Sequence, residues 1–206
     1  MNTSAKFSNI RDYPEYRSLK VDIIMSLLVV VLGAMLGFVS KATDSISFIG
    51  ELGTELGVWI FVATLVSAYS RYPYSAAINT MLFFLAMLFS YYLYGYLVLG
   101  FFPKSYFMGW LVMALLSPLA GFVVWFSKGK RYMGVVASAL PISILFALGY
   151  PFFYTYKPVL FFSLCFGIVL NVLLPETWHQ KIGTFLLSIL LAFAINVFHI
   201  LDLLPI

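Results

Sequence analysis

The chain has 206 residues, of which 63% are hydrophobic and only 10% are charged, and its mean hydropathy is +1.00. Soluble domains carry about 45–50% apolar and about 25% charged residues, so this composition excludes a water-soluble globular protein. The formal net charge is +4, but the basic residues fall in short loops instead of one patch, so we expect no nucleic acid among the partners.

The chain begins with its only long polar stretch, residues 1–20, which we expect to be a cytoplasmic N-terminal tail. The apolar segment after Lys20 is long, and no convincing small-residue cleavage site follows it before the next apolar segment. It is therefore expected to remain as the first helix. Residues 21–206 are predicted to form a single transmembrane helical domain, because no linker or low-complexity tract separates the apolar segments.

Almost all of this domain divides into apolar runs of near twenty residues. A helix rises about 1.5 Å per residue, so one such run can cross a hydrocarbon layer about 30 Å thick. The predicted fold class is all-α, a polytopic transmembrane helix bundle of about seven spans. The alternative is six spans plus a re-entrant segment, because residues 43–56 also suit an external loop, a surface helix or a re-entrant turn. The predicted spans are residues 21–40, 56–70, 76–99, 107–126, 133–149, 159–174 and 182–201.

Two prolines fall inside predicted spans. Pro118 and Pro141 have no backbone N–H and are expected to kink their helices, which frees a carbonyl group in each. A nearby hydroxyl group can satisfy such a carbonyl, and the candidates are Ser117, Ser138 and Ser143.

The loop charges predict the orientation in the bilayer. With the N-terminus in the cytoplasm, only Lys41, Lys104 and Lys157 of the 12 basic residues lie outside. Cytoplasmic loops of membrane proteins are enriched in Lys and Arg, so this orientation is favoured over its reverse. An odd number of spans then places the C-terminus outside. The expected location is a cell membrane, with the lipid bilayer as the first partner.

No pattern in the sequence predicts catalysis. Cys165 is the single cysteine, and His179 and His199 fall at opposite ends of the last predicted span, without metal-ligand spacing. The serines inside spans have no acid or histidine at helical spacing. We therefore expect no enzyme, no metal and no cofactor. The alternative of an intramembrane enzyme requires that Asp44, Glu51 and Glu55 converge with His199 or Asp202 at the outer surface.

The least generic feature is an aromatic cluster with charges at its edge, on the predicted outer side. On a helix Tyr92 and Tyr96 share one face, and Tyr91 and Tyr94 share a neighbouring one, so a cavity between helices could be lined by several phenol rings. Such a site could hold an aromatic or cationic solute, oriented by a carboxylate. The alternative is an aromatic belt at the interface. The candidate ligand-binding residues are Glu51, Glu55, Tyr91, Tyr92, Tyr94, Tyr96, Lys104 and Tyr106.

Two further features are common in membrane proteins. The tryptophans Trp59, Trp110, Trp125 and Trp178 lie near predicted span ends and are interpreted as interfacial anchors. Gly33 and Gly37 form a small-xxx-small pair that allows close packing of helices, either within the chain or with a second protein.

The central third of the chain contains four motifs: YSxxPxxAAxN at 69–79, SYYxY at 90–94, GFFPKSYxMxW at 100–110, and SP with WxxKGK within 117–130. In these motifs it resembles a family of small, uncharacterised multi-span membrane proteins of Gram-positive bacteria that carries a domain of unknown function. This resemblance implies a membrane protein and no particular activity. In size and character the chain is also similar to the substrate-binding subunits of energy-coupling vitamin transporters, which implies an ATPase module as a partner.

Two functions therefore compete. The first is a small-solute-binding or transport-associated membrane subunit with an external aromatic-lined site. The second is an accessory, scaffold or immunity-type protein that packs laterally on another membrane protein through Gly33 and Gly37.

Overall fold

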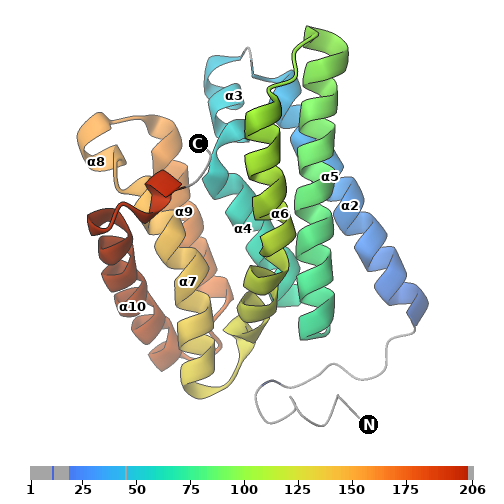
Figure 1. Cartoon of the computed structure of the whole chain (residues 1–206). Coiled ribbons are helices and arrows are strands. Elements are labelled where there is room, and N and C mark those ends of the chain that lie inside the picture. The colour runs from blue at the N-terminus through green and yellow to red at the C-terminus, as the bar shows by residue number, and fades with distance from the viewer. Residues whose placement is uncertain (1–10, 12–18, 45, 204–206) are drawn as a thin grey trace.

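The computed structural model describes residues 11, 19–44 and 46–203, and in this part of the chain it contains helices and no strand (Figure 1). The predicted all-α class is confirmed. The helices are α2 (Leu19–Ala42), α3 (Ser47–Thr54), α4 (Leu56–Tyr69), α5 (Pro73–Leu99), α6 (Lys104–Trp125), η1 (Phe126–Lys128), α7 (Arg131–Gly149), α8 (Phe152–Thr155), α9 (Pro158–Leu173), α10 (Trp178–Val197) and η2 (Ile200–Leu203).

Five helical segments among the described residues are long and apolar enough to cross a membrane: α2, α5, α6 with η1, α7 with α8, and α10. A sixth is obtained if α3 and α4, which meet at a bend of 49°, count as one broken span. Helix α9 has 16 residues and is therefore only about 24 Å long, short of a typical span. The expected count of seven spans is not confirmed. Within the range 43–56, Ser47–Thr54 form α3, and Glu55 separates it from α4.

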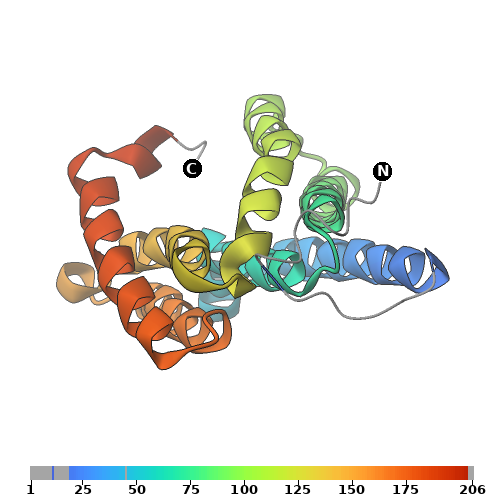
Figure 2. The same ribbon diagram turned by 90° about the horizontal axis from the view of Figure 1, so that it is seen from below.

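The described helices fall into an N-terminal and a C-terminal group. In the first, α5 packs between α2 and α6, and in the second, α7 packs between α9 and α10. Helix α4 touches α5 and α6 as well as α7 and α9, so it joins the groups. Seen from below, α6 and α10 extend from the same side of this arrangement and stand apart (Figure 2).

The two ends of the bundle differ. One end, called the α3 end here, carries α3, α8, η2 and the connection from α5 to α6 (Figure 1). The other end carries the connections from α4 to α5 and from α6 to α7 (Figure 1). It is called the Arg11 end here, because Arg11 bonds the last turns of α4 and α6. The largest buried apolar cluster joins α4, α6, α7 and α9, so the two groups share a core. Its fully or nearly fully buried members are Ala68, Val124, Ile142, Leu145, Leu170 and Leu174.

Arg11 ties the ends of two helices together. Its guanidinium donates hydrogen bonds to the carbonyl oxygens of Trp125 at 2.7 Å and Ala68 at 2.8 Å, and it lies 4.7 Å from the centre of the Trp125 ring. The last carbonyls of a helix have no partner within the helix and carry a partial negative charge. A cation shared between α4 and α6 therefore stabilises both ends at once.

A serine hydroxyl satisfies the carbonyl freed by proline in α6, and neither predicted serine does so in α7. Pro118 cannot bond the carbonyl of Ala114, and the hydroxyl of Ser117 donates to that oxygen at 2.7 Å. This expectation is confirmed. In α7, which contains Pro141, the hydroxyl of Ser143 bonds Leu140 and that of Ser138 bonds Ser127, so neither serves the carbonyl that Pro141 frees.

The glycine pair of α2 packs inside the chain. A Cβ atom on Gly33 would overlap the carbonyl oxygen of Phe83, and one on Gly37 would overlap the carbonyl oxygen of Met87 and the hydroxyl of Ser90. Both neighbours belong to α5. Because α5 occupies this stripe, the stripe is not a free surface for a helix of another protein.

Candidate ligand cavity

A cavity of about 660 Å³ lies at the α3 end, between α4, α5 and α6 on one side and α7, α10 and η2 on the other. Its volume is within the range of about 300–1,000 Å³ that is typical of small-molecule sites. It forms where the two helix groups diverge, because α6 and α10 stand apart while α4 and α7 remain packed beneath them (Figure 2).

Aromatic rings from three helices form one wall of the cavity. The Trp59 ring of α4 meets the Trp110 ring of α6 edge to face, with centroids 5.7 Å apart, and it also contacts Tyr91 of α5. Tyr91 in turn packs against Tyr92 at 5.3 Å. The indole N–H of Trp59 donates to the carbonyl of Gly53 at 2.9 Å, so the bend between α3 and α4 fixes this ring. Edge-to-face pairs are favourable, which makes the wall well defined.

Polar groups gather near the α3 end of the lining. Lys41 at the end of α2 pairs with the Asp44 carboxylate at 2.6 Å, and its Nζ lies 5.1 Å from the centre of the Tyr91 ring. Thr54 donates its hydroxyl hydrogen to the Gly50 carbonyl at 2.9 Å. Among the described residues, Lys41 is the only charged one in the lining. An ammonium group over a ring face is stabilised by cation–π attraction.

Most of the remaining lining is apolar, and it includes exposed positions. Leu116 and Ala120 of α6 are exposed, as is Ile200 of η2 on the opposite side. Ile144 of α7 and Ile195 of α10 complete this part. The cavity therefore opens sideways between α6 and α10, toward the surroundings of the bundle, and the opening is made of hydrocarbon side chains.

Three of the predicted ligand-binding tyrosines line this cavity, namely Tyr91, Tyr92 and Tyr106. The other two do not. Tyr94 packs against Phe38 of α2 with ring centroids 5.1 Å apart, and Tyr96 is 59% exposed. Tyr92 and Tyr96 share a face of α5, but only Tyr92 lines the cavity, because residues 96–100 at the end of α5 are all exposed.

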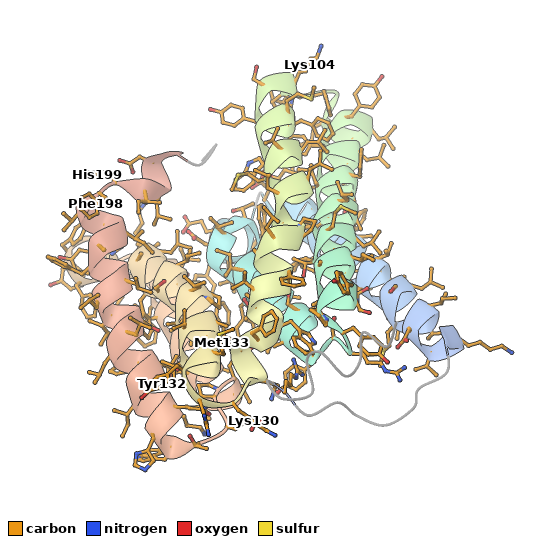
Figure 3. All side chains as sticks on the ribbon, turned by 60° about the horizontal axis from the view of Figure 1, so that its bottom comes forward. Lys104, Lys130, Tyr132, Met133, Phe198 and His199 are labelled. Atoms are coloured by element: carbon orange, nitrogen blue, oxygen red, sulfur yellow. The ribbon has the colours of Figure 1, made fainter. Side chains whose placement is uncertain are left out.

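The predicted charged residues lie outside the lining. Lys104 begins α6 and projects from the tip of that helix (Figure 3). Glu51 is exposed on α3, and Glu55 is half-buried at the bend, between the lining residues Thr54 and Leu56. The charged group that lines the cavity among the described residues is therefore the ammonium group of Lys41, and neither predicted carboxylate lines it.

Sequence reasoning did not select Lys41, Trp59 or Trp110 as site residues. Lys41 was counted only among the basic residues predicted to lie outside the membrane, and the two tryptophans were interpreted as interfacial anchors. Their common signal was a predicted position on the same side of the membrane as Tyr91. That signal could have grouped them, since residues from different spans meet only at a common depth.

In the described part of the chain, the potential metal ligands do not assemble into a second centre. His199 and Asp202 form a pair at 3.2 Å in which both side chains are mostly exposed. Within residues 19–44 and 46–203, together with Arg11, no three His, Cys, Asp or Glu side chains are placed to hold a metal ion.

The site thus combines an aromatic wall, a lysine and an apolar opening at the side of the bundle. Comparison with protein-family models, with curated proteins and with solved structures finds no match for this chain.

Proposed function

We propose that this chain is a small-solute-binding membrane subunit that holds a partly apolar molecule in the cavity at the α3 end. The observation that carries the proposal is the 660 Å³ cavity with its wall of Trp59, Trp110 and Tyr91. Aromatic side chains bury about 150–250 Å² each and hold a ligand by stacking and van der Waals contact. Few polar groups are needed in such a site to fix orientation, and Lys41 and Thr54 supply them.

The proposed topology has seven crossings, with the broken α3–α4 segment and the short α9 each serving as one. Successive long segments then run in alternate directions, as they do in Figure 1. Positive loop charge favours a cytoplasmic Arg11 end and an external α3 end, with the C-terminus external. On this topology the solute site faces the outer leaflet. The basic residues at the Arg11 end are Arg11, Lys20, Arg71, Lys128, Lys130, Arg131 and Lys181.

The test compares two neighbouring leucines of α6. Leu116 is 53% exposed and lines the cavity, whereas Leu115 is 54% exposed and does not. Leu116→Trp should fill the opening and displace the solute, and Leu115→Trp adds the same ring outside the site. Native mass spectrometry of the gently purified proteins should show a retained small molecule on the wild type and on Leu115→Trp, and most of it lost from Leu116→Trp. Absence of any retained molecule from the wild type, or equal retention by both variants, would refute the proposal.

A further inference from the structure

The charge and shape of the cavity restrict what it can hold. We propose that the ligand is a single-chain amphiphile with an acidic headgroup, a carboxylate or a phosphate. Its headgroup lies at Lys41, and its hydrocarbon chain extends along α6 toward the opening between α6 and α10. This inference rests on the proposed function.

The headgroup position follows from the placement of Lys41. Its side chain is 20% exposed, and it is held between the Tyr91 ring and the Asp44 carboxylate, which is itself 43% exposed. Ion pairs that keep contact with solvent are weak, so an acidic headgroup can share Lys41 with Asp44 or replace Asp44 there. The hydroxyl groups of Tyr91 and Tyr106, in the same lining, can donate hydrogen bonds to it.

The sign of the charge is set by which residues reach the cavity. A cationic solute would meet the ammonium group of Lys41 at the polar end of the lining, and like charges repel in a site of low dielectric. The carboxylates that could balance a cation lie outside the lining: Glu51 and Glu55 are not part of it, and Asp44, also outside it, already pairs with Lys41. An anion is therefore the complementary partner.

The chain position follows from the shape of the lining. The α6 residues that line the cavity run from Tyr106 to Ala120, about 21 Å along the helix axis, whereas a sphere of 660 Å³ would be only about 11 Å across. Met113, Leu116 and Ala120 follow one another at spacings of three and four, which places them in one strip. An extended hydrocarbon chain fits such a strip and can leave or enter sideways from the bilayer.

The experiment uses the full-length protein in discs of zwitterionic phosphatidylcholine and a fatty acid that carries a photoreactive diazirine near its end. The acid should label peptides that contain Leu116 and Ile200, and its neutral methyl ester should label them at least about tenfold less at equal concentration. Lys41→Met should lower labelling by the acid to the level of the ester. Asp44→Asn should raise it, because it frees the lysine without removing it. The control Lys104→Met removes a cation from the same end, outside the lining, and should change nothing.

The outcomes separate the two proposals. Equal labelling by acid and ester, both blocked by Leu116→Trp, would overturn the acidic headgroup and leave the solute-binding function standing. Stronger labelling by an alkylamine analogue would overturn the sign of the charge. A wild type that is labelled by none of the probes and retains no molecule on purification would overturn both proposals. If Lys41→Met fails to fold, the increase expected of Asp44→Asn still decides the role of the lysine.

Discussion

Replacing Gly37 by alanine is expected to weaken the packing of α2 on α5. The new Cβ would overlap the backbone carbonyl of Met87 and the hydroxyl of Ser90, and backbone cannot move aside as a flexible side chain can. Overpacking of this kind costs about 1–3 kcal/mol. It also displaces the Ser90 hydroxyl, which donates to the Ala34 carbonyl at 2.7 Å, and a hydrogen bond contributes about 0.5–1.5 kcal/mol. Together these terms give about 1.5–4.5 kcal/mol, and the better helix propensity of alanine offsets about 1 kcal/mol, so the expected loss is about 0.5–3.5 kcal/mol.

Thermal unfolding in detergent measures this loss. One kcal/mol shifts the midpoint by about 2–4 °C in a chain of this size, so Gly37→Ala should lower it by roughly 1–14 °C. The control is Gly183→Ala in α10, where a Cβ would meet only Val135 at 3.6 Å, an ordinary contact. That variant should unfold no earlier than the wild type, because alanine favours helix over glycine by about 1 kcal/mol. Gly37→Ala could instead leave the midpoint unchanged and abolish co-purification of another membrane protein. That result would refute packing on α5 and favour the hypothesis of a scaffold that packs laterally on a partner protein.

Three further predictions concern other parts of the bundle. Arg11→Ala removes two hydrogen bonds to the ends of α4 and α6, each worth about 1.5–3 kcal/mol because the donor is charged. The unfolding midpoint should therefore fall, and solute retention should stay unchanged. An unaltered midpoint would show that this contact is not stabilising. Thr177→Ala removes the capping box of α10, in which the Thr177 side chain accepts a hydrogen bond from the N–H of Gln180. The free energy of unfolding, measured by chemical or thermal unfolding, should fall by about 0.5–2 kcal/mol. A smaller decrease would mean that the cap is dispensable. In a Cys165→Ala background, Asp202→Cys should react with an impermeant maleimide on intact cells, and Tyr132→Cys should not. The opposite pattern of labelling would reverse the proposed orientation.

Much of the fold was predictable because it depends on local properties of the sequence. Apolar runs of about twenty residues predict membrane helices, and α5 and α6 begin and end within a few residues of the predicted spans 76–99 and 107–126. The hydrogen bond from Ser117 to the carbonyl freed by Pro118 was predictable too, because both residues lie within one turn of the same helix. The break before α4 was less clear, since it depends on how α3 packs.

The site was predictable only in part. Tyr91 and Tyr92 were expected in a cavity and line one, but Tyr94 and Tyr96 were grouped with them on helical spacing alone. Helical spacing states which residues share a face, and it does not state which helix that face meets. In a bilayer both the buried and the lipid-facing sides of a helix are apolar, so hydrophobic periodicity, which identifies the buried face in a soluble protein, carries little information.

The sequence by itself determined that the described part of this protein is a bundle of apolar helices, with most of its positive charge at one end. Only the tertiary structure decided that Gly33 and Gly37 face α5, that α6 and α10 diverge, and that the charge at the resulting cavity is Lys41. The physical reason is that these features depend on which helices become neighbours. That choice is made by the fit of small residues and ring edges between segments far apart in the chain, which no local pattern records.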